Sequence, residues 1–62
     1  MWFYLFKVIS GPDEGYLFFC PAANYKSALS WLTNVEGWKK EELQFVDQYN
    51  YDESEAMGYD VW

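Results

Sequence analysis

Two apolar runs near the start of the chain predict a β-hairpin. Residues 2–9 and 16–20 are rich in aromatic and β-branched side chains, which is typical of strands. Between them, residues 10–15 contain two glycines, one proline and two acids, a composition typical of a turn. Pro21 follows the second run. Because proline has no N–H to donate to a neighbouring strand, we expect it to end the strand.

The positions after Asn24 predict an amphipathic helix over residues 25–34. Apolar side chains recur there at spacings of three and four residues, which places them along one face of a helix. Asn24 is a favourable N-cap, because its side-chain oxygen can accept a hydrogen bond from the first turn. Gly37 then lies where a helix commonly ends.

The pattern over residues 38–51 fits either a strand or a helix. As a strand, the segment places Leu43, Phe45 and Tyr49 on one face, and Asp47 interrupts that face. As a helix, it groups Leu43, Val46 and Tyr49 or Asn50. We favour a third strand, because a hairpin and one helix need another strand to widen the sheet.

The C-terminal residues predict a short helical turn and a docked tail. Asp52 and Glu55 have the spacing of a capping box, with Asp52 as the N-cap, which predicts a helical turn over residues 53–57. Gly58 suits the position that follows a helix. Residues 59–62 are largely apolar, so we expect them to pack against the rest of the chain.

These elements predict a single compact domain, residues 1–62, with an α+β fold. The fold is a small antiparallel sheet in ββαβ order, with one amphipathic helix on one face and a short C-terminal helical turn. A domain of this size buries only about 60% of the surface that its unfolded chain exposes, so its stability is marginal without further support. Cys20 is the only cysteine, which excludes an intramolecular disulfide.

The first predicted strand is apolar on both faces, and such strands normally have both faces covered. The predicted helix covers one face. Either the C-terminal tail or a second copy of the chain covers the other. We favour a homodimer, because a domain this small seldom covers two sheet faces alone. The candidate dimer-interface residues are Phe3, Leu5 and Ile9.

The charge is strongly negative and unevenly distributed. The net charge is −6: residues 1–40 contain three acids and all four lysines, whereas residues 41–62 contain seven acids and no base. Nucleic-acid binding needs a basic surface, so we exclude it. Acids mixed with aromatic residues are instead typical of a protein interface, where aromatic side chains act as anchors and acids steer a basic partner. The protein-interface candidates are Trp31, Trp38, Asp47, Tyr51, Asp52, Glu53, Glu55 and Asp60.

Catalytic and cofactor chemistry find little support in the sequence. The chain has no histidine, the usual acid–base group at neutral pH, and Cys20 lies in an apolar strand where a thiol is normally inert. Asn50 and Asp52 begin a calcium-loop pattern, but Glu55 stands where that loop requires glycine. We therefore predict a protein that is not an enzyme and that has no catalytic residue, metal or cofactor.

The N-terminal segment does not have the features of a signal peptide or a membrane span. Its apolar run is short, Lys7 interrupts it, and no basic segment precedes it. We expect a cytoplasmic protein with no membrane association, located in the host cytoplasm if a virus encodes it.

The leading functional hypothesis is a non-enzymatic protein-binding module, a small acidic homodimeric inhibitor that occludes a basic or hydrophobic surface of a larger protein. Viruses and mobile elements use domains of this type against host enzymes, including defence enzymes. A second hypothesis is a nucleic-acid mimic that blocks a DNA- or RNA-binding protein, which requires the seven C-terminal acids to form a continuous stripe. A third is a structural or assembly subunit of a larger complex, and a fourth is small-molecule binding at a dimer seam.

Overall fold

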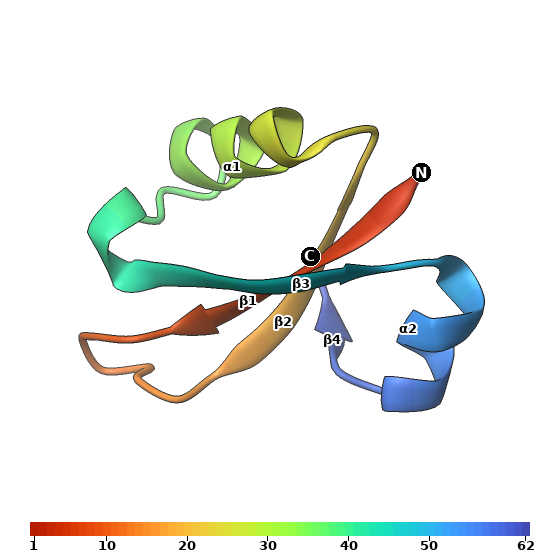
Figure 1. Cartoon of the computed structure of the whole chain (residues 1–62). Helices are drawn as coiled ribbons and strands as arrows, with labels where there is room; N and C mark the ends of the chain where they lie inside the picture. The colour runs from red at the N-terminus through yellow and green to blue at the C-terminus, as the bar shows by residue number, and fades with distance from the viewer.

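The predicted hairpin forms the centre of a four-stranded sheet (Figure 1). In the computed structural model, which describes residues 1–62, the hairpin strands are β1 (Trp2–Val8) and β2 (Leu17–Ala22). The third strand, β3 (Leu43–Tyr49), pairs antiparallel with β1, and β4 (Asp60–Val61) pairs parallel with β2. The sheet order is β3-β1-β2-β4. The α+β prediction is therefore confirmed, but the sheet is mixed because the tail adds a parallel edge strand.

The prediction that Pro21 ends β2 is wrong. β2 continues through Pro21 to Ala22, and Pro21 lies opposite Phe3 of β1. The backbone N–H of Trp62 donates to the carbonyl oxygen of Phe19 at 2.8 Å, so the backbone groups of Phe19 face β4. Because this direction alternates along a strand, the nitrogen of Pro21 also faces the β4 side, beyond the last paired residue of β4. No hydrogen bond is lost there, and the strand tolerates proline.

The amphipathic helix α1 (Tyr25–Asn34) lies over one face of the sheet, as predicted (Figure 1). The side-chain oxygen of Asn24 accepts a hydrogen bond of 2.8 Å from the backbone N–H of Ser27, which confirms the N-cap. Gly37 adopts a left-handed φ of +82°, which lets the chain turn back towards the sheet. The core between α1 and the sheet consists of Tyr4, Phe6, Val8, Phe18, Cys20, Ala28 and Leu32.

The ambiguous segment forms a strand, but the predicted common face is broken by a bulge. A short 3₁₀ turn, η1 (Lys40–Glu42), leads into β3. Asp47 pairs with Leu5 and Phe45 pairs with Phe6, so Val46 is an extra residue with no partner on β1. A bulge shifts the alternation of side chains by one position. Phe45 therefore lies on the α1 face of the sheet, packed near Phe6, whereas Asp47 shares the opposite face with Leu5.

The predicted C-terminal turn is a helix that begins two residues earlier than expected. α2 spans Tyr51–Met57, and Asn50, not Asp52, is its N-cap. The Asn50 side chain accepts from the N–H of Glu53 at 2.8 Å, and the Glu53 carboxylate accepts from the N–H of Asn50 at 3.0 Å. Gly58 ends the helix at φ +73°, as predicted. Neither helix is long and apolar enough to cross a membrane.

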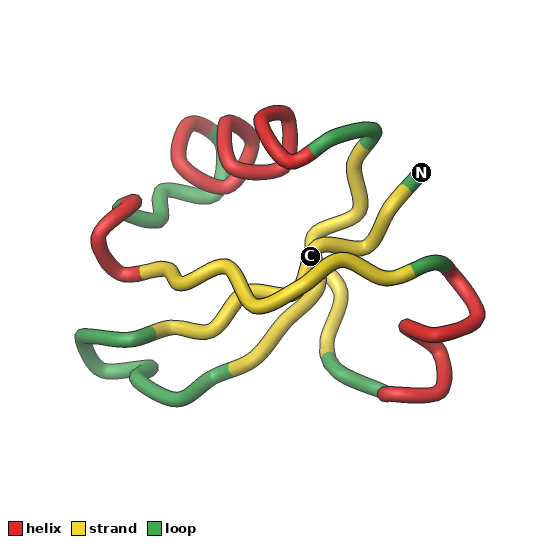
Figure 2. Tube along the Cα trace, viewed as in Figure 1, coloured by secondary structure: helices red, strands yellow, loops and turns green.

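The second face of the sheet is covered by the C-terminal part of the same chain. Figure 2 shows α1 on one side of the strands and α2 on the other. The ring of Tyr51 lies 6.0 Å from that of Phe3, and the ring of Tyr59 lies 5.9 Å from that of Phe19. Leu5 is only 3% exposed as a result. Of the two accounts of this face, the structure shows the one in which the tail covers it.

Because the C-terminal segment covers this face, the three dimer-interface candidates differ in how exposed they are. Leu5 is a core residue, so it cannot form an interface while the chain keeps this fold; its assignment to a dimer surface is corrected. Phe3 is half-buried beside Tyr51, and only Ile9 is well exposed, at 44%. The homodimer itself stays a prediction.

Candidate functional site

The eight predicted interface residues do not form one patch. Tyr51, Asp52, Glu53 and Glu55 all belong to α2, on the second face of the sheet. The other four lie on different elements: Trp31 on α1, Trp38 after α1, Asp47 on β3 and Asp60 on β4. Only Trp38 and Asp60 from this set are brought near a common cluster. That cluster contains two residues that the sequence analysis did not single out, Tyr16 and Trp62.

Four aromatic rings meet at the end of the sheet where β4 joins β2. Tyr16, Phe18 and Trp38 are arranged as stacked neighbours, with ring centroids 5.6 Å apart in each pair and interplanar angles of 21° and 16°. Trp62 crosses this row at a steep angle, 5.8 Å from Trp38 at 69°, 6.4 Å from Tyr16 at 70° and 5.6 Å from Phe18 at 55°. The rings thus form a corner with walls in two directions. Edge-to-face and offset-stacked pairs of this kind are the favoured aromatic geometries.

Hydrogen bonds hold two walls of this corner in place. The Nε1–H of Trp62 donates to the hydroxyl oxygen of Tyr16 at 2.9 Å, and that hydroxyl donates to the Asp60 carboxylate at 2.7 Å. Desolvation, together with the hydrogen bond to Asp60, raises the pKa of the Tyr16 hydroxyl above its ordinary value of 10.0. The hydroxyl therefore stays protonated at neutral pH and keeps donating to Asp60. The backbone bond from Trp62 to Phe19 fixes the tail at the same point.

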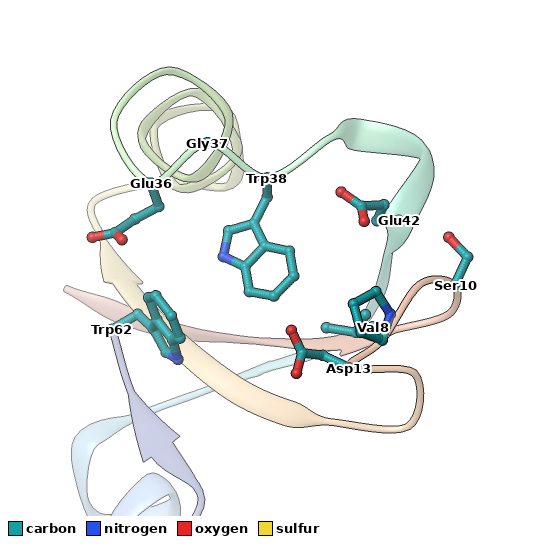
Figure 3. Close-up of a pocket in the computed structure, with 9 residues that line it drawn as sticks. Val8, Ser10, Asp13, Glu36, Gly37, Trp38, Glu42 and Trp62 are labelled. Atoms are coloured by element: carbon teal, nitrogen blue, oxygen red, sulfur yellow. The ribbon is translucent and has the colours of Figure 1, made fainter.

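The aromatic corner opens into a pocket that faces solvent. A hollow of about 310 Å³ is lined by Asp13, Tyr16, Trp38 and Trp62, and we call it the Trp38–Trp62 pocket. A second hollow of about 270 Å³ adjoins it and shares Asp13, Trp38 and Trp62. Figure 3 shows the carboxylate of Asp13 directed towards the ring of Trp38, with Trp62 beside it. The floor is aromatic and the rim is acidic.

Three carboxylates surround the adjoining hollow, and two of them have no partner within the chain. Glu42 accepts a hydrogen bond of 3.0 Å from the backbone N–H of Lys39, so it holds η1 in place. The side chains of Asp13 and Glu36 take part in no hydrogen bond within the chain and are exposed. They contribute two uncompensated negative charges at the rim. Asp13 comes from the hairpin loop and Glu36 from the turn after α1.

One buried polar atom at this site also lacks a partner. The Nε1–H of Trp38 is inaccessible to solvent and makes no hydrogen bond. Figure 3 shows this nitrogen on the edge of the ring that faces Trp62 and Glu36. A buried donor without an acceptor costs about 1–3 kcal/mol, so its place beside a pocket marks a position where the fold is not optimised for stability alone.

The acidic helix α2 is a different kind of surface. Glu53 belongs to the capping box, and Asp52 lies in the first turn, where a negative charge is favourable. A hydrogen bond to Glu55, followed by its negative charge, raises the pKa of the exposed Tyr51 hydroxyl above 10.0. The ring of Tyr51 packs on Phe3, so much of this set serves the helix itself and its contact with the sheet.

The thiol of Cys20, the remaining reactive group, is packed in the hydrophobic core. Cys20 is 2% exposed within the core, and burial raises the pKa of its thiol from 9.0 to about 11, with the charge of Glu36 as a second cause. The nucleophilic thiolate is therefore scarce at neutral pH. No three acidic or sulfur side chains lie close enough together to hold a metal ion. The strongest candidate site is the Trp38–Trp62 pocket.

Sequence reasoning identified Trp38 and Asp60 as candidates but missed Asp13, Tyr16 and Trp62. Tyr16 and Trp62 are 46 positions apart, and only the two-residue strand β4 brings them together. The apolar tail was a usable signal, because a docked tail ending in tryptophan must place a large ring on some surface. Neither a family model, nor a curated protein, nor a solved structure was found to match this chain.

Proposed function

We propose that the chain is a non-enzymatic protein-binding module of the cytoplasm, an inhibitor that docks on a basic surface of a partner protein and occludes it. The observation that carries this proposal is the Trp38–Trp62 pocket, with unpartnered carboxylates of Asp13 and Glu36 at its rim. Aromatic side chains in a concave, partly desolvated site are typical energetic centres of protein interfaces. Carboxylates around them favour a basic partner and raise its rate of association.

The same charges support a protein partner more than mimicry of nucleic acid. A mimic needs carboxylates in a continuous row, since duplex DNA carries one charge per about 1.7 Å of its axis. Five of the seven C-terminal acids instead fall into two groups at opposite ends of β3, in η1 and in α2, and Asp60 lies apart on β4, at the other edge of the sheet. Seven strand residues, roughly 20 Å at the usual rise, separate the groups, with only Asp47 between them.

A homodimer remains part of the hypothesis, with a different surface. The two faces of the sheet are occupied by α1 and α2, so a second copy would have to use an exposed edge. The outer edge of β3 has no neighbouring strand, and Phe45 and Val46 on that strand are 42% and 46% exposed. Light scattering on a sizing column, at low and high salt, tests this point: a mass near twice 7.4 kDa supports it and a monomer refutes it.

Affinity purification with matched charge-reversal variants tests the proposed function. The wild-type chain serves as bait, the retained proteins are identified by mass spectrometry, and binding of the purified partner is then measured at several salt concentrations. We expect a basic partner whose affinity falls as salt rises. Asp13→Lys should weaken binding at least about tenfold, whereas Asp52→Lys, the same charge change on α2, should leave it nearly unchanged.

Three results would refute the proposal. One is that no protein is retained specifically. Another is an affinity for the purified partner that does not depend on salt. The third is an equal loss with Asp13→Lys and Asp52→Lys, since that would assign binding to the net charge of the chain and not to the pocket.

A further inference from the structure

We infer that the Trp38–Trp62 pocket binds an alkylammonium group, such as the head of a lysine side chain, against its aromatic rings. The inference rests on the proposed function, because lysine is a group that a basic protein surface presents. It goes further by naming the chemical group that enters the pocket. Three observations support it: the arrangement of the rings, the unpartnered carboxylates and the absence of the chain's own lysines from the lining.

The arrangement of the rings suits a compact cation. A cation within about 6 Å of a ring centroid is attracted by the negative face of the ring, most strongly for tryptophan. Here Trp62 stands at 69° to Trp38 and at 70° to Tyr16, so the rings line the pocket from two directions. A tetrahedral ammonium or methylated ammonium can contact walls in two directions at once. A planar guanidinium gains most from stacking on a single face.

The acidic rim supplies the countercharge. The carboxylate of Asp13 lines the pocket itself, and that of Glu36 lines the adjoining hollow. Both are free of hydrogen bonds within the chain, so neither has to give up a partner to meet a ligand. A neutral apolar side chain would fill the same space but would leave these charges uncompensated. The rim therefore selects a cation over an apolar group of equal size.

The chain's own cations leave the pocket free. No lysine lines either the Trp38–Trp62 pocket or the hollow that adjoins it. Two walls are also fixed before any ligand arrives, by the hydrogen bonds from Trp62 to Tyr16 and from Tyr16 to Asp60. A preformed site loses less conformational freedom on binding than a mobile one, which favours affinity for a small group.

Four small probes test the inference. Three are blocked tripeptides, acetyl-Gly-X-Gly-amide, in which X is lysine, trimethyllysine or norleucine, and the fourth is tetramethylammonium chloride. Binding is followed through the indole N–H signals of the ¹⁵N-labelled chain, where Trp2 and Trp31 serve as internal controls. We expect the lysine and trimethyllysine peptides to shift the signals of Trp38 and Trp62 saturably. The norleucine peptide should bind at least about tenfold more weakly.

The probes also distinguish two sources of the group. Tighter binding of the peptides than of tetramethylammonium indicates a side chain of a partner protein, whereas equal or tighter binding of tetramethylammonium indicates a free quaternary ammonium compound. Asp13→Asn should weaken binding of the lysine peptide about threefold to tenfold. Asp52→Asn, which removes the same charge from α2, should not weaken it. Circular dichroism checks that both variants are folded.

Three results overturn the inference: norleucine binds as well as lysine, the signals of Trp2 and Trp31 move as much as those of Trp38 and Trp62, or no probe shifts any signal. These failures are separate from failure of the proposed function. A basic protein partner that binds through Asp13 while no alkylammonium probe binds would leave the proposed function standing and refute the inference. Probes that bind without any protein partner would do the reverse.

Discussion

The indole nitrogen of Trp62 donates a hydrogen bond of 2.9 Å to the hydroxyl oxygen of Tyr16, 46 positions earlier in the chain. This bond joins the tail to the residue just before β2. The Tyr16 hydroxyl in turn donates a hydrogen bond of 2.7 Å to the carboxylate of Asp60. A single hydroxyl thus accepts one bond and donates another. The fourth strand and the walls of the pocket depend on the same group.

Replacing Tyr16 with phenylalanine should therefore loosen the tail. Tyr16→Phe removes both hydrogen bonds while keeping the ring, and we expect the free energy of unfolding to fall by about 1–2 kcal/mol. Urea denaturation followed by tryptophan fluorescence measures the change. Tyr25→Phe is the matched control, since the hydroxyl of Tyr25 makes no hydrogen bond within the chain. Equal effects of the two substitutions would show that the bonds to Trp62 and Asp60 contribute nothing.

Substitutions of Leu5 test whether the C-terminal part of the chain covers the second face of the sheet. Leu5→Glu places a carboxylate in the space between the sheet and the C-terminal segment, where Leu5 is 3% exposed. We expect the free energy of unfolding to fall by at least about 3 kcal/mol, which is enough to unfold a large fraction of the molecules of a small, marginally stable domain. Ile9→Glu, just after the end of β1 and 44% exposed, should change stability by less than about 0.5 kcal/mol. Circular dichroism and urea denaturation measure both.

A folded Leu5→Glu variant would contradict the structure. If that variant were a stable monomer while the unmodified chain formed a dimer, Leu5 would belong to an interface between copies, as the sequence analysis expected. The milder Leu5→Ala keeps the question measurable if Leu5→Glu does not fold, with an expected loss of about 2–5 kcal/mol.

The sequence was sufficient for most elements but not for the way β3 and the tail join the sheet. The hairpin, α1 and its Asn24 cap follow from local patterns, which depend only on residues a few positions apart. The bulge at Val46 does not. It reverses the face of Tyr49 relative to Phe45, and it arises from pairing with β1, which no local pattern records.

The candidate site was predicted only in part, for the same reason. Trp38 and Asp60 were among the predicted interface residues, and Asp60 was chosen because it lies in the acidic C-terminal segment. Trp62 reaches Trp38 through a parallel pairing of only two residues. So short a pairing leaves no periodicity in the sequence. The pocket is a product of tertiary structure.

Two substitutions at the start of α2 test whether Asn50, and not Asp52, is the N-cap of the helix. Asn50→Ala removes the side chain that accepts from Glu53, and we expect a loss of about 1 kcal/mol. Asp52→Ala should cost only a few tenths of a kcal/mol, because Asp52 contributes a favourable charge in the first turn and no capping hydrogen bond. Urea denaturation of the two variants compares them directly. A larger loss for Asp52→Ala would restore Asp52 as the cap.

Alkaline pH should destabilise the fold, and the sign follows from three raised pKa values. Burial raises the pKa of the Cys20 thiol from 9.0 to about 11. Desolvation raises the pKa of the Tyr16 hydroxyl, and a hydrogen bond to Glu55 raises the pKa of the Tyr51 hydroxyl. A group with a raised folded-state pKa stabilises the fold fully below its unfolded pKa and loses that contribution as pH rises through the folded value.

We therefore expect the urea midpoint to be constant up to about pH 8 and to fall between about pH 9 and 11. Cys20 begins the loss, since its unfolded pKa is the lowest of the three. Cys20→Ala should flatten the early part of this fall, even though its smaller side chain lowers stability at every pH. The ¹³Cβ chemical shift of Cys20, measured by NMR across the same pH range, follows its ionisation separately from that of the tyrosines. Titration of the folded thiol near its ordinary pKa of 9.0, with no change in the urea midpoint, would show that the interior around Cys20 is open to water.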